Sequence, residues 1–295
     1  MGIKDNTTLN AKIGGYKLPA DFKCLNTNFL GSLEDLSFAE RLASIYKFVL
    51  GKNLPNGLVE RFDSDEFLAN VLSVDDKISV LELFGGETCS YNDFIFDKSS
   101  FEMEICSLAF VIVSDYVDLA EGGVINLGEK INVGAQVCDG KLLLAMHFCT
   151  LIKLPINTLI FGTDKPVDET FKNMFFATPK SGEVDEITNA FFEETEYLFD
   201  PVSAGGLVAY DIFYDDYEDD LETLIISLYS PYLFSRALLK TLTGINELSV
   251  DKAIKKLSEF TALEVPNCIE SGFLAPFYKN LSEISVKDAL EIIKG

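Results

Sequence analysis

The sequence has no tryptophan, a single histidine and no Cys-x-x-Cys pair among its six cysteines. These absences disfavour a histidine-rich or paired-cysteine metal site, because such sites need several ligands at close spacing. His147 lies in an apolar stretch between Met146 and Phe148. We interpret it as a packed or half-exposed helical residue, and no Ser-His-Asp or Cys-His arrangement stands out. We expect free thiols at the scattered cysteines, which are Cys24, Cys89, Cys106, Cys138, Cys149 and Cys268.

Positive charge and long apolar runs are also scarce. The chain has 24 Lys and Arg against 47 Asp and Glu, which gives a net charge of -23. An acidic surface repels phosphate backbones and anionic membranes, so we expect no nucleic-acid partner. Apolar runs such as Leu108–Val113 are too short to cross a bilayer, and Met1–Ala20 has no apolar segment typical of a signal peptide. These features predict a cytoplasmic protein with no membrane contact.

One stretch indicates a ligand loop. Ile78–Phe84 is apolar and β-rich apart from Ser79 and Glu82, and Gly85 and Gly86 end it where the backbone turns freely. A strand therefore leads into a loop at its C-terminal end. Open α/β sheets bind their ligands at that end.

The rest of the chain indicates two parts. Ser37 and Glu40 form a capping box ahead of a helix. Asp63 or Ser64 is expected to cap a second helix, with Phe67, Val71 and Leu72 on its apolar side. We therefore predict an N-terminal helical region over residues 1–76 and an α/β domain over residues 77–295. Within the domain we expect strands at Ile105–Val113, Asn157–Phe161 and Thr223–Leu228, and helices at Lys141–Lys153 and Glu183–Leu198 and from near Ser230, Val250 and Val286.

The central loop resembles a known enzyme family. A Leu81–Phe84 strand leads to the sequence Tyr91, Asn92, Asp93 and Phe94. This sequence is similar to the lysine-bearing segment of threonine synthase, a pyridoxal-phosphate (PLP) enzyme of fold type II. In that family the second of these four positions is the lysine that binds the cofactor. Here it is Asn92, and an amide nitrogen cannot form a Schiff base.

Further matches follow in the family's order along nearly the whole chain. They are the turn at Gly14, Gly15, Tyr16 and Pro19, the segment with Asp200, Pro201, Ala204 and Gly206, and the segment with Pro231 and Phe234. The family carries a much longer piece of cofactor domain between the positions of Asn92 and Cys138. The resemblance therefore implies an α/β, threonine-synthase-like fold-type II architecture with a truncated cofactor domain.

The resemblance also implies a degenerate cofactor site. The loop residues Gly85, Gly86, Thr88, Asp139, Gly140 and Ser230 are its vestiges. Asp139 lies in the family's phosphate loop, where a carboxylate would repel the phosphate. Leu228 replaces a threonine near the ring nitrogen. Lys98 and Lys141 are the lysines nearest in sequence that could substitute for the lost one, and a surface role is the simpler interpretation of both.

Two functions stay open at this stage. One is a pseudoenzyme with a binding or regulatory role and no cofactor. The alternative is an active PLP-dependent threonine synthase or related lyase acting on O-phosphohomoserine.

The acidic segment 211–222 lacks calcium-loop spacing, so we interpret it as a solvated connection. Because truncation would uncover the apolar Ile78–Phe84 and Ile105–Val113 runs, we also expect a homodimer or a complex with another protein.

Overall fold

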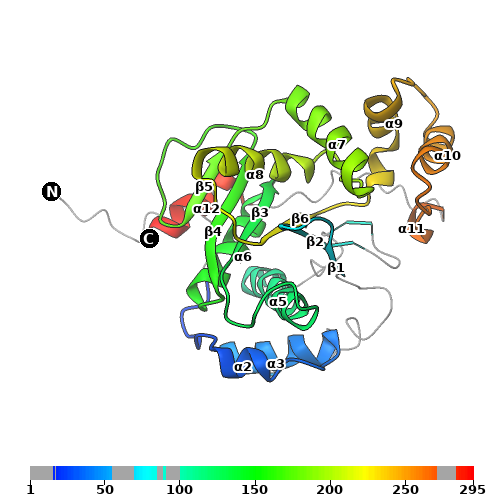
Figure 1. Cartoon of the computed structure of the whole chain (residues 1–295). Coiled ribbons are helices and arrows are strands. Elements are labelled where there is room, and N and C mark those ends of the chain that lie inside the picture. Colours follow the sequence, from blue (N-terminus) through cyan, green and yellow to red (C-terminus); the bar gives the residue numbers. More distant parts are fainter. Residues whose placement is uncertain (1–15, 17, 55–69, 85–88, 91–99, 271–283) are drawn as a thin grey trace.

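The computed structural model describes residues 16, 18–54, 70–84, 89–90, 100–270 and 284–295 (Figure 1). Its strands are β1 (Asn70–Ser73), β2 (Ile78–Glu82), β3 (Ile131–Val137), β4 (Ile156–Thr163), β5 (Met174–Ala177) and β6 (Thr223–Ser227). Its helices are α2 (Thr27–Gly31), α3 (Phe38–Leu50), α5 (Phe101–Glu121), α6 (Gly140–Leu151), α7 (Ser181–Thr195), α8 (Ala204–Tyr217), α9 (Ser235–Thr243), α10 (Val250–Thr261), α11 (Asn267–Glu270), α12 (Val286–Lys294) and the 3-10 turn η2 (Pro231–Phe234).

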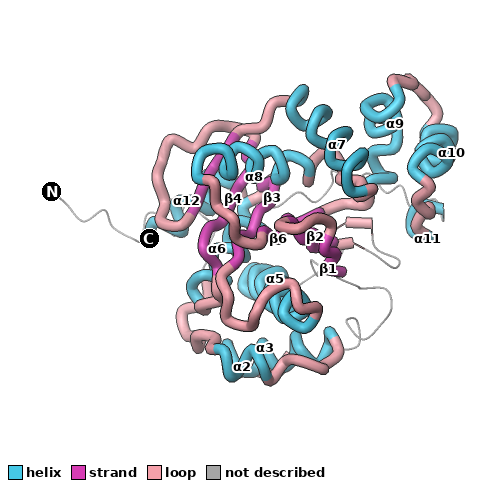
Figure 2. The backbone as a smooth tube through the Cα atoms, viewed as in Figure 1, coloured by secondary structure: helices cyan, strands magenta, loops and turns pink. Residues whose placement is uncertain are grey.

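The strands in this part of the chain form one sheet in the order β1-β2-β6-β3-β4-β5 (Figure 2). Strand β1 is antiparallel to β2, and each of the other neighbouring pairs is parallel. The C-terminal ends of β2, β6, β3, β4 and β5 therefore lie along one edge of the sheet. This confirms the predicted α/β class and places the loops after these strands next to one another.

Helices cover both faces of the sheet (Figure 1). In β6, Leu224 and Ile226 pack into a cluster with α5 and α6, while Ile225 packs into a second cluster with α8. Successive side chains of a strand point to opposite faces, so an uninterrupted apolar strand is suited to a sheet covered on both sides. A third cluster joins η2, α9 and α10 at one end of the molecule.

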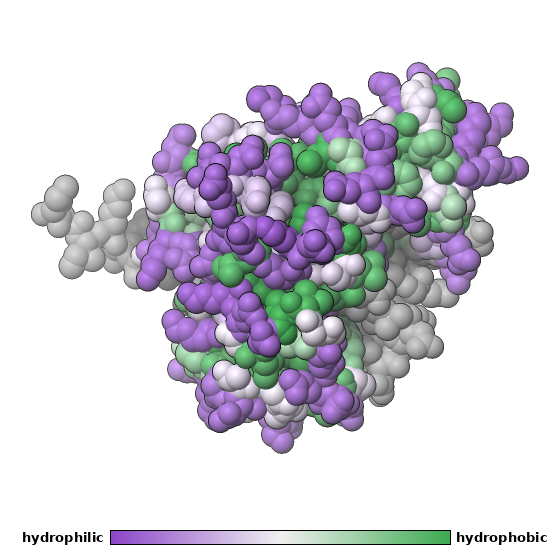
Figure 3. Space-filling model, viewed as in Figure 1, coloured by the Kyte–Doolittle hydropathy of each residue, from purple (hydrophilic) through white to green (hydrophobic). Residues whose placement is uncertain are grey.

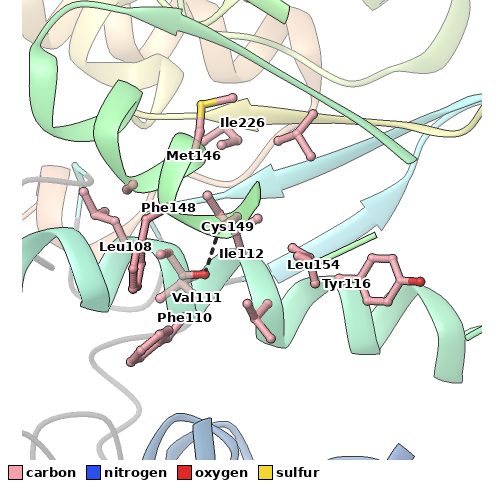
Figure 4. Close-up of a cluster of buried hydrophobic side chains, with 14 of the residues drawn as sticks. Leu108, Phe110, Val111, Ile112, Tyr116, Met146, Phe148, Cys149, Leu154 and Ile226 are labelled. Atoms are coloured by element: carbon pink, nitrogen blue, oxygen red, sulfur yellow. Dashed lines mark hydrogen bonds between the residues drawn. The ribbon is translucent and has the colours of Figure 1, made fainter. Parts of the chain in front are cut away.

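The expected strand at Ile105–Val113 is wrong, because this run forms the middle of helix α5. Ser100 caps the helix by accepting a hydrogen bond from the Met103 N–H at 3.3 Å. The helix is apolar around most of its circumference because α3 and α6 pack against it, and a short apolar run does not distinguish such a helix from a buried strand. In Figure 4 the Cys149 thiol of α6 donates to the Ala109 carbonyl of α5 at 3.4 Å.

Helix α5 also removes the reason for expecting a partner over these apolar runs. Residues 105–113 are all buried, and so are the first four residues of β2. The covering elements belong to the same chain. The inference that truncation leaves these two segments uncovered is therefore wrong for the described residues.

Other predicted elements have mixed outcomes. The capping box of Ser37 and Glu40 is confirmed at the start of α3. Val71 and Leu72 lie in β1 and not in a helix, so the sheet begins before residue 77. Residues 211–217 belong to α8, so only the end of the acidic segment 211–222 is a connection. None of the described helices is long and apolar enough to cross a membrane.

Among the cysteines whose side chains the structure describes, all but Cys89 follow the prediction. Cys24, Cys106, Cys138 and Cys149 are free thiols. Cys89 is disulfide-bonded, which contradicts the expectation for that residue. No paired spacing of the cysteines indicates this bond.

Candidate functional site

The predicted site residues divide into described and undescribed ones. Gly85, Gly86, Thr88 and Asn92 lie outside the described residues, as does Lys98. Asp139 and Gly140 lie where β3 leads into α6. Ser230 follows β6 at the same edge of the sheet, is fully buried, and has no hydrogen-bond partner for its hydroxyl within the described chain.

The start of α6 is capped by the chain itself. The Asp139 carboxylate accepts hydrogen bonds from the N–H groups of Lys141 at 2.8 Å and Leu142 at 3.2 Å. Asp139 is only 3% exposed. The first N–H groups of a helix are the ones that bind a phosphate, since they have no partner inside the helix. Here the carboxylate already occupies two of them.

The third N–H group of this turn is also occupied. Gly140 donates to the Ile284 carbonyl at 3.1 Å, just before α12. A Cβ at residue 140 would lie 2.7 Å from the Ser285 carbonyl oxygen and 2.9 Å from the Ala289 Cβ. Glycine is required here by the close approach of α12. The same approach closes the turn to a ligand.

The lysine of this turn is engaged as well. Lys141 Nζ lies 2.5 Å from Glu104 Oε2, and both side chains are 12% exposed. Such an ion pair ties the first turn of α6 to the first turn of α5. Lys141 is therefore held by a carboxylate and is not an exposed surface lysine, which corrects that interpretation. It also lacks the free amine that a substitute Schiff-base lysine needs.

A second buried carboxylate lies where α8 begins. Asp200 accepts hydrogen bonds from the N–H groups of Val202 at 2.9 Å and Ser203 at 3.0 Å, and from the Ser203 hydroxyl. The Ser203 oxygen in turn accepts the Leu228 N–H at 2.7 Å. Burial raises the pKa of Asp200 to about 6, although the hydrogen bonds that it accepts oppose the shift. These bonds tie the start of α8 to the end of β6.

Close backbone packing sets the position of α8 on the sheet. A Cβ at Gly206 would lie 2.7 Å from the Gln136 nitrogen of β3. A Cβ at Gly205 would lie 2.4 Å from Gln136 Oε1, and one at Gly162 of β4 would lie 2.2 Å from the same atom. Larger residues at these positions would push α8 away from β3 and β4. The amide of Gln136 also donates to Asp164 at 3.2 Å, at the mouth of the cavity described next.

A cavity of about 1080 Å³ opens at this edge of the sheet. Its floor includes Gln136 and Cys138 at the end of β3, and Asp164 after β4. Its walls come from α7, from the start of α8 and from α9. The charged lining residues are four acids and one base: Asp164, Asp185, Glu186, Glu193 and Lys240. This lining favours a neutral or cationic ligand over a phosphorylated one.

The thiol of Cys138 is not suited to nucleophilic chemistry. Burial raises its pKa, and the carboxylates of Asp139, Asp200 and Asp164 raise it further. Burial lowers the pKa of His147 on α6, so the imidazole is neutral near pH 7. Within the described residues there is no cluster of three or more metal-ligating side chains.

The described residues do not fit the cofactor that the resemblance implies. PLP needs a free helix N-terminus for its phosphate and an amine for its aldehyde. At α6 the N–H groups are satisfied by Asp139 and Ile284. The amine of Lys141 is paired with Glu104.

The architecture is that of an α/β protein with a mostly parallel sheet and a cavity at the C-terminal edge of that sheet. Neither a protein-family model nor a curated protein sequence matches the chain. Solved structures of threonine synthases do match it, so the predicted threonine-synthase-like fold is confirmed.

Three of these structures show the extent of the likeness. The yeast threonine synthase matches with a TM-score of 0.61 and 13% identity, over 85% of this chain and 91% of that one. The Escherichia coli enzyme gives 0.58 and 13%, over 84% and 88%. The PLP-bound enzyme from Brucella melitensis gives 0.59 and 11%, over 86% and 95%. At this identity the likeness establishes the fold alone. This chain is shorter than the chains of the three enzymes.

The sequence reasoning missed several residues of this edge. Gln136 lies in β3, which was not predicted, and Ser203 was not singled out within the matched Asp200 segment. The Glu104 partner of Lys141 was hidden because residues 105–113 were assigned to a strand. The acids Glu102 and Glu104 are typical of the first turn of a helix, and they could have indicated that α5 begins here.

Proposed function

We propose that this protein is a threonine-synthase-like pseudoenzyme, which has lost PLP-dependent catalysis and serves as a binding or regulatory protein. The observation that carries the proposal is the start of α6. Its three leading N–H groups bond to Asp139 and to the Ile284 carbonyl. A phosphate arriving there would have to displace a carboxylate and a packed main-chain segment.

The cavity at the C-terminal edge of the sheet supports a binding role. Its volume of about 1080 Å³ is in the range of small-molecule sites, and its lining combines apolar and charged groups. The excess of acids disfavours a phosphorylated amino acid such as O-phosphohomoserine. We therefore propose that the cavity takes a ligand without phosphate, and that an amine is the favoured class.

Calorimetric titration tests the proposal with matched ligands. Pyridoxal phosphate and pyridoxal differ only in the phosphate. A retained phosphate site would therefore bind pyridoxal phosphate with a much higher affinity than pyridoxal. We expect no such advantage, because the N–H groups that would provide it are occupied. Micromolar binding of pyridoxal phosphate, with pyridoxal at least a hundredfold weaker, would instead support the alternative of an active threonine synthase.

A further inference from the structure

Helix α12 covers the start of α6 with a small contact surface. It has nine residues, from Val286 to Lys294, and its N-terminus is capped by Ser285, which accepts the Asp288 N–H. Only Ala289 and Leu290 of the helix are buried, together with Ile284 just before it. Among the described helices and strands, α12 contacts α6 most extensively. Its position therefore depends chiefly on one neighbour.

A second cavity lies beneath α12. Its volume is about 670 Å³, and it is enclosed by α12, the end of β3 and the loop of residues 163–169. Cys138 and Asp164 line this cavity and also the larger one. The two spaces therefore adjoin at the C-terminal ends of β3 and β4, and α12 forms the outer wall of the smaller one.

An ion pair joins α12 to the opposite side of the smaller cavity. Lys294 at the end of α12 pairs with Glu169 of the opposite loop, and both residues line the cavity. Lys294 also lies 6.0 Å from the ring centroid of Phe171. The side chains of Lys294 and Glu169 are 34% and 54% exposed, so the pair is a weak one.

These features distinguish α12 from an ordinary core helix. A nine-residue helix is not stable in water without its packing partner. Elements with few buried apolar contacts open at a lower free-energy cost than the global fold. Helix α12 is held by two buried side chains, by the partly buried Val286, Ile292 and Ile293, by one hydrogen bond before it and by the exposed ion pairs of Lys294. Because this contact is smaller than that of the central strands, we expect α12 to open before the sheet and α5 do.

We propose that α12 is a displaceable strap. When docked, it seals the first turn of α6 and the smaller cavity. When lifted, it frees the Gly140 N–H and joins the smaller cavity to the larger one, so that α12 controls how large a ligand the sheet edge accepts. The strap does not depend on whether PLP catalysis has been lost.

Hydrogen exchange with mass-spectrometric detection tests the opening of α12. We expect α12 to exchange faster than β3 in the wild-type protein. The Gly140→Ala variant places a Cβ against Ser285 and Ala289 and should raise the exchange of α12 at least tenfold. Gly182→Ala in α7 is the matched control, because its added Cβ has nothing within 4 Å. Exchange of α12 at the same rate as β3 in all three proteins would overturn the strap.

The ion pair gives an independent test. Lys294→Glu should raise α12 exchange by up to about fivefold. The charge swap with Glu169→Lys should reverse only part of the increase, because Lys294 also pairs with Glu291 of α12 at 2.9 Å. Cys138 then reports on the cavity, in a Cys24→Ser background that removes the exposed thiol. We expect its alkylation to accelerate in parallel with α12 exchange. Faster exchange of α12 with unchanged alkylation would show that α12 does not control access.

Discussion

The starts of α6 and α8 lie at the same edge of the sheet and are built alike, yet they differ in what lies outside them. At α6, Asp139 accepts two N–H groups and α12 packs over the turn. In the turn before α8, Asp200 accepts the N–H groups of Val202 and Ser203 as well as that of Tyr229, and Pro201 and Val202 line the larger cavity. One helix start is sealed, and the other borders open space.

The comparison shows that two turns at this edge of the sheet hold carboxylates of the same chain, while a cavity lies beside them. In both places a buried carboxylate of the chain accepts main-chain N–H groups, in the first turn of α6 and in the turn that leads into α8. Such N–H groups are the ones that could otherwise bind an anion. The N–H groups at this edge that could bind an external anion therefore bind carboxylates of the same chain. The cavity that adjoins it persists because α7, α8 and α9 wall it independently of the α6 turn.

The largest effect should come from removing the carboxylate at α8. Asp200→Ala leaves the N–H groups of Val202, Ser203 and Tyr229 and the hydroxyl of Ser203 without this acceptor. Because the site is fully buried, the free energy of unfolding should fall by about 4 kcal/mol. Urea denaturation measures it. A loss below about 1 kcal/mol would show that Asp200 does not hold α8 to β6.

The same carboxylate should make stability depend on pH. Its pKa is about 6 in the folded protein, above the ordinary value of 3.8. The folded state therefore keeps a proton that the unfolded state has lost. The stabilisation is complete below about pH 4 and is lost as the pH rises through 6, by roughly 3 kcal/mol from this group. Urea denaturation at a series of pH values measures the free energy of unfolding of the wild type and of Asp200→Asn. Between pH 4 and 6 we expect it to fall more steeply with pH in the wild type, and parallel curves for the two proteins would contradict this prediction.

The carboxylate at α6 should contribute less. Asp139→Ala removes a helix cap, which lowers the free energy of unfolding by about 1 kcal/mol. Asp139→Asn keeps a capping oxygen and should recover most of the loss. The cost is smaller than at Asp200, because the fully buried Asp200 carboxylate also accepts the Ser203 hydroxyl and holds the start of α8 to β6. Equal losses for Asp139→Ala and Asp200→Ala would remove the distinction between the two helix starts.

Restoring the family's lysine should have the smallest effect. We expect Asn92→Lys to show no turnover of O-phosphohomoserine with added PLP, because an amine alone does not hold the cofactor phosphate. Phosphate release from O-phosphohomoserine measures the activity. A triple variant that adds Asp139→Gly and Lys141→Ala serves as a further comparison. Turnover by the single variant would show that the α6 turn accepts phosphate after all.

Local patterns in the sequence predicted much of the fold. The Ser37 and Glu40 box fixed the start of α3, and the apolar, β-branched runs at β2, β4 and β6 were assigned correctly. Strand β3 was missed because Gly134, Asn132 and Gln136 interrupt its apolar pattern. Their positions depend on tertiary contacts: Gly134 accommodates Ile225 of the neighbouring strand, and Asn132 bonds to Asp219.

The candidate site was predicted less completely, for a physical reason. Asp139 could be placed at the start of α6 from the family's loop, and its repulsion of phosphate followed from charge alone. That Ile284 and α12 cover the same turn could not be foreseen, because it joins residues far apart in the sequence. The strand predicted at residues 105–113 was wrong for a similar reason. The run is buried by α3 and α6, which are distant in the sequence, and its apolar pattern alone does not distinguish a buried helix from a strand.

The most direct test of the account is the reaction of the wild-type protein with PLP. The protein is incubated with PLP, reduced with borohydride, and digested for peptide mass spectrometry, with its visible spectrum recorded before reduction. We predict no absorbance beyond that of free cofactor, and no lysine modified above the level in a denatured control. A stoichiometric adduct at a single lysine would contradict the claim that the cofactor site has been lost.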